Sequence, residues 1–233
     1  MGTYCGGSSG DAISNGVVAN DGFIYVTGGT SSNNNISTPG SFQPIIAGGS
    51  NGFLSKFSTI NGTRIWGTYY PAPTNSISSN NYSDILITGQ TNGTPQNIAT
   101  AGSHQQNFAG GVADGFLAKF SSNGQRYWGT YYGGPMSDNI NSITCDINND
   151  IYIGGVTSST NATFEIATVG CHQINHGSGS NDGFIVKFMG CTNTAPTNTT
   201  LNSSGCYGAR DYCQPLVREF KLVQQSNRGS IFG

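Results

Sequence analysis

Three copies of one sequence unit constrain the fold of this chain more than any other feature. Four landmarks recur in the same order: a short β-rich run ending in glycine, a loop motif, a hydrophobic run and an aromatic run. The runs ending in glycine are residues 24–28, 85–89 and 151–155, and the loop motifs are 38–43, 100–105 and 168–173. The hydrophobic runs are 51–57, 114–120 and 182–188, and the aromatic runs are 61–70 and 123–132. The third copy lacks the aromatic run. Units of this kind bury their hydrophobic faces by stacking against one another.

Each copy is predicted to form a small antiparallel sheet. The short runs are separated by Asn-Gly, Asp-Gly and Gly-Gly pairs, which favour tight hairpins. Alternation within residues 51–57 places Phe53 and Phe57 on one face, and it places Lys56 on the other, more exposed face. We therefore expect an all-β fold of four-stranded antiparallel units arranged about an axis as β-propeller blades. The predicted units are residues 11–72, 75–134 and 138–188.

Four segments resemble the bacterial β-propeller repeat called SBBP. They are DGFLAKF (114–120), NGQRYWGTYYGG (123–134), NNDIYIGG (148–155) and TPGSFQ (38–43), and the resemblance covers roughly residues 2 to 188. It implies propeller architecture within a large secreted or surface-displayed bacterial protein, often from Bacteroidetes, and it implies no catalytic signature. Members of this family carry enough repeats for a ring of about six to eight blades, so three copies depart from the pattern.

The two ends of the repeat region are complementary in sequence. Residues 2–7 (GTYCGG) match residues 67–70 (GTYY) and 129–134 (GTYYGG), so residues 1–7 are predicted to be the last strand of a blade. The third copy lacks this strand, which leaves an unpaired edge that invites pairing with another chain. Two interpretations follow. Either the chain self-associates, for example as a twofold assembly of six blades, or the remaining blades belong to a longer chain.

A different composition begins near residue 189. Residues 189–233 form a predicted Cys-containing tail or linker, to which we assign no fold. Either it packs against the last blade or it leads to a further module. Candidate disulfide partners are Cys145, Cys171, Cys191, Cys206 and Cys213, with a bridge across the short loop between Cys206 and Cys213 as one option. An even cysteine count favours an oxidising, extracellular location.

Charge and composition exclude several classes of protein. With 9 Lys and Arg against 11 Asp and Glu, the chain lacks the basic surface needed to bind a phosphate backbone, so no nucleic-acid partner is expected. Its apolar runs are far shorter than the roughly 20 residues of a membrane-spanning helix. Glu165 and Glu219 are the only glutamates, and no nucleophile motif is present, so we expect no enzymatic activity.

Three groups of residues are candidate binding sites, and each has an alternative interpretation. His172 and His176 could ligate a metal, although His172 occupies the repeat position of Phe42 and His104, which favours loop packing. Asp146 and Asp150 flank a loop with some features of a calcium site, in a place where a hairpin turn is also needed. No cofactor is expected, with calcium at this loop as the alternative, and zinc is disfavoured because no Cys-x-x-Cys pair exists. The aromatic candidates for sugar stacking are Trp66, Tyr70, Trp128 and Tyr132, which are more often core at repeated strand positions.

Three functional hypotheses remain open. The first is a non-enzymatic extracellular or cell-surface scaffold for adhesion or assembly, whose partner is a surface protein. The second is a lectin-like propeller that binds glycans. The third is a structural subunit of a filament or sheath, assembled by strand exchange between chains.

Overall fold

The computed structural model describes residues 2–48, 51–93, 97–160, 166–168 and 170–190, together with the backbone of two short strands, β12 (Cys206–Tyr207) and β13 (Tyr212–Cys213). Within these residues the fold is all-β, as predicted, and contains no helix. Eleven antiparallel strands form its main body. They are β1 (Asp11–Val18), β2 (Phe23–Thr30), β3 (Asn51–Ser58), β4 (Arg64–Tyr70), β5 (Thr74–Ser79), β6 (Ile85–Gln90), β7 (Gly115–Phe120), β8 (Arg126–Tyr132), β9 (Asp138–Cys145), β10 (Ile151–Thr157) and β11 (Asp182–Phe188).

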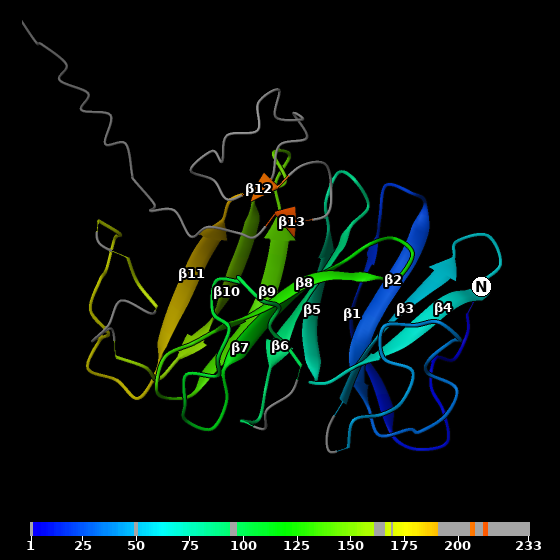
Figure 1. The fold of residues 1–233 in the computed structure, drawn as a ribbon, viewed down its shortest axis with the longest axis horizontal. Coiled ribbons are helices and arrows are strands. Elements are labelled where there is room, and N and C mark those ends of the chain that lie inside the picture. Colours follow the sequence, from blue (N-terminus) through cyan, green and yellow to red (C-terminus); the bar gives the residue numbers. More distant parts are fainter. Residues whose placement is uncertain are drawn as a thin grey trace, which may run out of the picture.

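These strands form three sheets, which lie next to one another in chain order (Figure 1). The first sheet has the order β1-β2-β3-β4, the second β5-β6-β7-β8 and the third β9-β10-β11. Strand β5 packs against β1 and β2 of the first sheet, and β9 packs against β5 and β6 of the second. The first strand of each sheet therefore lies beside the first strand of its neighbour.

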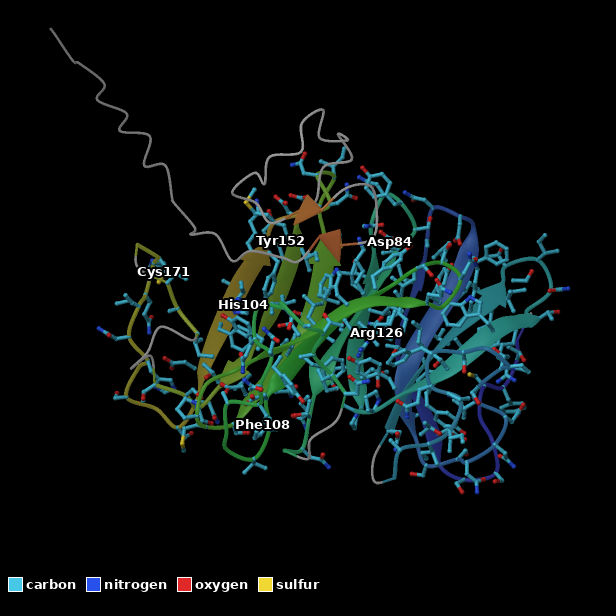
Figure 2. The ribbon with its side chains drawn as sticks, viewed as in Figure 1. Asp84, His104, Phe108, Arg126, Tyr152 and Cys171 are labelled. Carbon is cyan, nitrogen blue, oxygen red and sulfur yellow. The ribbon has the colours of Figure 1, made fainter. Side chains whose placement is uncertain are left out.

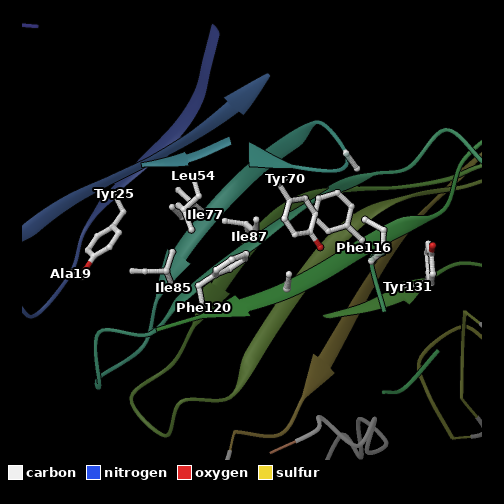
Figure 3. Packing of buried hydrophobic residues seen from close by; sticks show 13 residues of the cluster. Ala19, Tyr25, Leu54, Tyr70, Ile77, Ile85, Ile87, Phe116, Phe120 and Tyr131 are labelled. Carbon is white, nitrogen blue, oxygen red and sulfur yellow. The ribbon is translucent and has the colours of Figure 1, made fainter. Parts of the chain in front are cut away.

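The hydrophobic core lies between neighbouring sheets. One cluster joins Tyr25, Leu54 and Tyr70 of the first sheet to residues of the second, among them Phe116, whose ring stacks on Tyr70 at 4.9 Å (Figure 3). A second cluster joins the second sheet to the third and contains Leu117. Because one face of a small sheet is apolar, stacking two sheets removes both apolar faces from water.

The lysine of each hydrophobic run was predicted to lie on a more exposed face, but Lys56 is buried and its two counterparts are half-buried. Lys56 is only 7% exposed, and its Nζ lies 2.9 Å from Oδ2 of Asp21. The same pair recurs as Lys119 with Asp84 at 2.8 Å and as Lys187 with Asp150 at 2.5 Å. In each sheet the carboxylate lies one or two residues before the second strand, and the lysine lies on the third strand. The ion pair between them compensates the desolvation of the lysine.

The stack of sheets is open at both ends. Residues 2–7, predicted to be a strand that pairs with another chain, form no strand within this one. The third sheet correspondingly has three strands where the other two have four, and the three sheets do not close into a ring. Across the described residues, no helix is long and apolar enough to cross a membrane.

Candidate functional site

The same arrangement of loop and strand holds the fourth strand in each of the first two sheets. In the first sheet, Thr38 N donates to Gly67 O at 2.9 Å and Tyr69 N donates to Gln43 O at 3.1 Å. The second sheet repeats both bonds, from Thr100 N to Gly129 O at 2.9 Å and from Tyr131 N to Gln105 O at 3.0 Å. The fourth strand thus lies between the third strand and the loop motif, and it forms hydrogen bonds to both.

The corresponding loop of the third sheet repeats part of this internal geometry, and among the described residues no fourth strand lies beside it. Cys171 N donates to Thr168 O at 3.2 Å, which matches the bond from Ser41 N to Thr38 O at 3.2 Å. Gln173 Nε2 donates to Asn175 O at 2.9 Å, as Gln43 Nε2 does to Ile45 O at 3.0 Å. The described part of this loop therefore repeats two internal hydrogen bonds of the loops that hold β4 and β8.

Between this loop and β11 lies a cavity of about 320 Å³. Its lining includes Thr168 and Gln173 from the loop motif and residues 183–187 from β11. Figure 2 shows Cys171, another lining residue, on the loop that projects beyond the edge of the third sheet. We call this cavity the open slot, because by its position it is the place that β4 and β8 fill in the other two sheets.

Apolar side chains are exposed at both ends of the stack, where their counterparts are buried between sheets. Ile185 on β11 is 70% exposed, whereas Leu54 and Leu117, at the same repeat position, are 0% exposed. At the other end Ile13 on β1 is 51% exposed, whereas its counterpart Ile140 on β9 is fully buried. Leu117 and Ile140 belong to one cluster, so the two open ends carry the two halves of an inter-sheet core.

The loop motif also supplies a ring that packs between sheets. Phe42 contacts Tyr70 and Phe120, with ring centroids 6.3 and 5.6 Å apart. His104 contacts Tyr132 and Phe188 in the same way, at 5.8 and 5.6 Å. The predicted loop-packing role therefore applies to both rings. His104 and His172, at the same repeat position, both count among the exposed residues, and His104 differs by its ring contacts with Tyr132 and Phe188.

His104 counts among the exposed residues, yet its ring packs against Tyr132 and Phe188, and this partial desolvation makes stability depend on pH. Desolvation lowers the pKa of His104 below its ordinary value of 6.5, so the folded state binds fewer protons than the unfolded state. Its contribution to stability is complete above pH 6.5 and is lost as the pH falls through the lower, folded-state pKa. We expect His104→Phe, which copies Phe42, to raise the melting temperature relative to wild type increasingly as the pH is lowered. Melting curves that stay parallel across this range would contradict the expectation.

The two candidate metal ligands do not form a shared site in the described structure. His176 is half-buried, and its Nδ1 lies 3.8 Å from Oδ2 of Asp182. No group of three or more His, Cys, Asp or Glu side chains with metal-binding geometry occurs among the described residues.

Asp146 and Asp150 are used within their own turn and sheet. Asp146 Oδ1 accepts hydrogen bonds from Asn148 N at 2.8 Å and Asp150 N at 2.9 Å. Asp150 pairs with Lys187 and accepts a hydrogen bond from Gly190 N at 2.6 Å. These contacts are those of a hairpin turn anchored to the third strand of its sheet.

The four candidate sugar-stacking aromatics lie between sheets. Tyr70, Trp128 and Tyr132 are buried, and Trp66 is half-buried with its Nε1 donating to Ser122 O of the next sheet at 3.1 Å. Tyr132 Oη donates to Ile166 O at 2.8 Å. Their surroundings are those of inter-sheet packing, and Tyr132 also lines the open slot.

The structure does not support disulfides through Cys145 and Cys171, because both are free thiols. Burial raises the pKa of the Cys145 thiol to about 11. Cys206 and Cys213 are directly opposite each other in the backbone ladder of β12 and β13, and their side chains lie outside the described residues, as does Cys191.

Sequence reasoning missed the residues that form the open slot. The roles of Thr168 and Gln173 emerge only from the hydrogen bonds of their counterparts in the other sheets, and the exposure of Ile185 only from comparison with Leu54 and Leu117. The repeat of the TxGxxQ pattern was the available signal.

A scan against protein-family models finds no match to this chain, and a search of curated proteins likewise finds none.

Proposed function

We propose that this protein is a non-enzymatic scaffold of β-propeller blades that assembles by strand donation between copies. In this proposal, residues 2–7 of one copy fill the open slot of the next copy as the fourth strand of its third sheet. The observation that carries it is the loop of the third sheet, which repeats the hydrogen bonds of the strand-holding loops, while none of the described residues of its own chain forms a fourth strand there.

Sequence and exposure identify the donated strand. Residues 2–7 read GTYCGG, which matches the GTYY of β4 and the GTYYGG of β8 and its continuation. Tyr4, the counterpart of the buried Tyr69 and Tyr131, is fully exposed. Docking would bury Tyr4 and Ile185, and each large apolar side chain removed from water stabilises the complex by about 1.5–3 kcal/mol.

The contact joins unlike ends, so it is a head-to-tail interface. The donated strand carries β1 with it, and it places the exposed Ile13 of the donor against Ile185 of the acceptor, as Ile140 faces Leu117 within one chain. Head-to-tail contacts give rings when the rotation closes and filaments when it does not. Two copies would supply six blades, which is within the range of about four to eight found in closed propellers. The extracellular location remains a prediction from the cysteine content.

Mass in solution tests the assembly. We expect the purified chain to have a mass that is a multiple of 24.3 kDa by analytical ultracentrifugation, twice this value for a closed ring. Ile185→Asp places a charge on the open face and should give a folded monomer, because the carboxylate would be desolvated at the interface.

Val112→Asp is the matched control, since Val112 is 77% exposed in the loop before β7 of the middle sheet, away from both ends. This variant should assemble as the wild type does. A wild-type chain that is folded and monomeric at every concentration would refute self-assembly and would favour closure by blades of a longer chain.

A further inference from the structure

Two carboxylates point to one place at the junction of the second and third sheets. A Cβ added to Gly133 would lie 2.8 Å from Oδ1 of Asp114 and 2.9 Å from Oδ2 of Asp138. Both aspartates are buried, at 0% and 1% exposed. Since each oxygen lies within about 3 Å of the same point, the two negative charges interact strongly.

The two carboxylates differ in how well they are hydrogen-bonded. Asp138 accepts from the hydroxyl of Thr157, from Ser159 Oγ at 2.9 Å and from Gly134 N at 2.8 Å. Asp114 Oδ2 accepts from Ala109 N at 2.6 Å, whereas its Oδ1 is buried without a hydrogen-bond partner. The oxygen that lacks a partner is the one that lies, with Asp138 Oδ2, beside Gly133.

The charge of this pair is not compensated by the protein. Among the described side chains, no ion pair joins a lysine, arginine or histidine to Asp114 or Asp138. Burial and the charge of Asp138 raise the pKa of the Asp114 carboxyl to about 7. Buried charges without a counter-charge are strongly unfavourable, so a positive charge at this place would stabilise the folded state.

Packing between sheets does not require an acidic pair. At the junction of the first and second sheets, the same repeat positions hold Asn51 and Ala72. Asn51 Oδ1 accepts from Ala47 N at 3.0 Å, as Asp114 does from Ala109 N, and its Nδ2 donates to Gly48 O at 3.1 Å. An uncharged junction therefore preserves the loop contact, and the two carboxylates of the other junction need a separate explanation.

We propose that Asp114 Oδ1 and Asp138 Oδ2 bind a hard divalent cation, such as calcium, between the second and third sheets. Such ions take carboxylate oxygens as ligands at about 2.3–2.6 Å, and two carboxylates match a double positive charge. The site is distinct from Asp146 and Asp150, and it does not depend on assembly between copies. Its bound ion ties the loop before β7 to the start of β9.

Thermal unfolding with and without calcium tests this site. After chelator treatment, we expect added calcium at about a hundred times its dissociation constant to raise the melting temperature of the wild type by about 5–11 °C at neutral to mildly alkaline pH. Asp114→Asn, which copies Asn51, should remain folded and should lose this shift. Terbium, a calcium substitute, should emit in the wild type through sensitisation by the adjacent Tyr132, and it should not emit in the variant.

Asp146→Asn is the matched control, because Asn80 occupies that position in the second sheet and its Oδ1 accepts the equivalent hydrogen bonds. This variant should keep the wild-type calcium shift. A wild-type melting temperature that is insensitive to calcium and other divalent ions would overturn the proposal and would leave a shared proton as the compensating charge. A full shift in Asp114→Asn would overturn it equally.

Discussion

Replacing Gly2 by valine is expected to convert the assembled protein into a folded monomer. The counterparts of Gly2 are Gly67 and Gly129, where an added Cβ would lie 2.2 Å from the carbonyl oxygens of Ile36 and Ile98. Nothing lies within 4 Å of a Cβ on Gly2 in the single chain, so its own fold should tolerate the substitution. In the open slot of a second copy, the valine would meet the carbonyl of Ile166, and the strand could not approach the loop.

Sedimentation and circular dichroism separate the two effects of this substitution. Gly2→Val should reduce the mass to 24.3 kDa and leave the β-sheet spectrum and melting temperature of the monomer unchanged. Gly10→Ser is the control, because Gly10 also has open space around it and Ser137 occupies its position in the third unit. Assembly of Gly2→Val at wild-type concentration would show that residues 2–7 do not fill the slot as β4 and β8 do.

Replacing Gly89 by alanine is expected to produce a large loss of stability. Gly89 on β6 pairs with Thr74, where the register of β5 shifts, and an added Cβ would lie 2.1 Å from Pro73 O and 2.9 Å from the Phe116 ring. The backbone at the bulge must move to relieve this contact, and the displaced ring belongs to the core between the first two sheets. We expect a loss of about 3 kcal/mol in the free energy of unfolding, which lowers the melting temperature by roughly 6–12 °C.

Chemical denaturation measures this loss, and Gly16→Ala provides its control. Gly16 lies on β1, and the nearest atoms to an added Cβ are 3.3 Å away. Ile77 and Ile143 occupy its position in the other two sheets, so a side chain fits there. Gly16→Ala should change the free energy of unfolding by less than about 1 kcal/mol. Equal effects of the two substitutions would show that the close approach at the bulge is not what requires glycine at position 89.

The repeated pattern predicts much of the fold and little of the candidate site. The all-β class and the strand content of each copy follow from alternation and turn residues, which act over a few neighbouring positions. The exposed position predicted for Lys56 was wrong because its partner, Asp21, lies 35 residues away and reaches it only after β2 pairs with β3. Thr168 and Gln173 were not identified because their role depends on a strand that, in this proposal, another copy supplies.

The amino-acid sequence by itself determined the repeated sheets, the missing fourth strand of the third copy and the unused strand sequence at residues 2–7, because these are properties of local pattern and of one copy compared with another. Only the tertiary structure decided that the loop of the third sheet repeats the hydrogen bonds of its counterparts, that Ile13 and Ile185 are exposed at opposite ends, and that Asp114 and Asp138 meet beside Gly133. The physical reason is that exposure and electrostatic interaction depend on distances between segments far apart in the chain, and stacking of the sheets sets those distances.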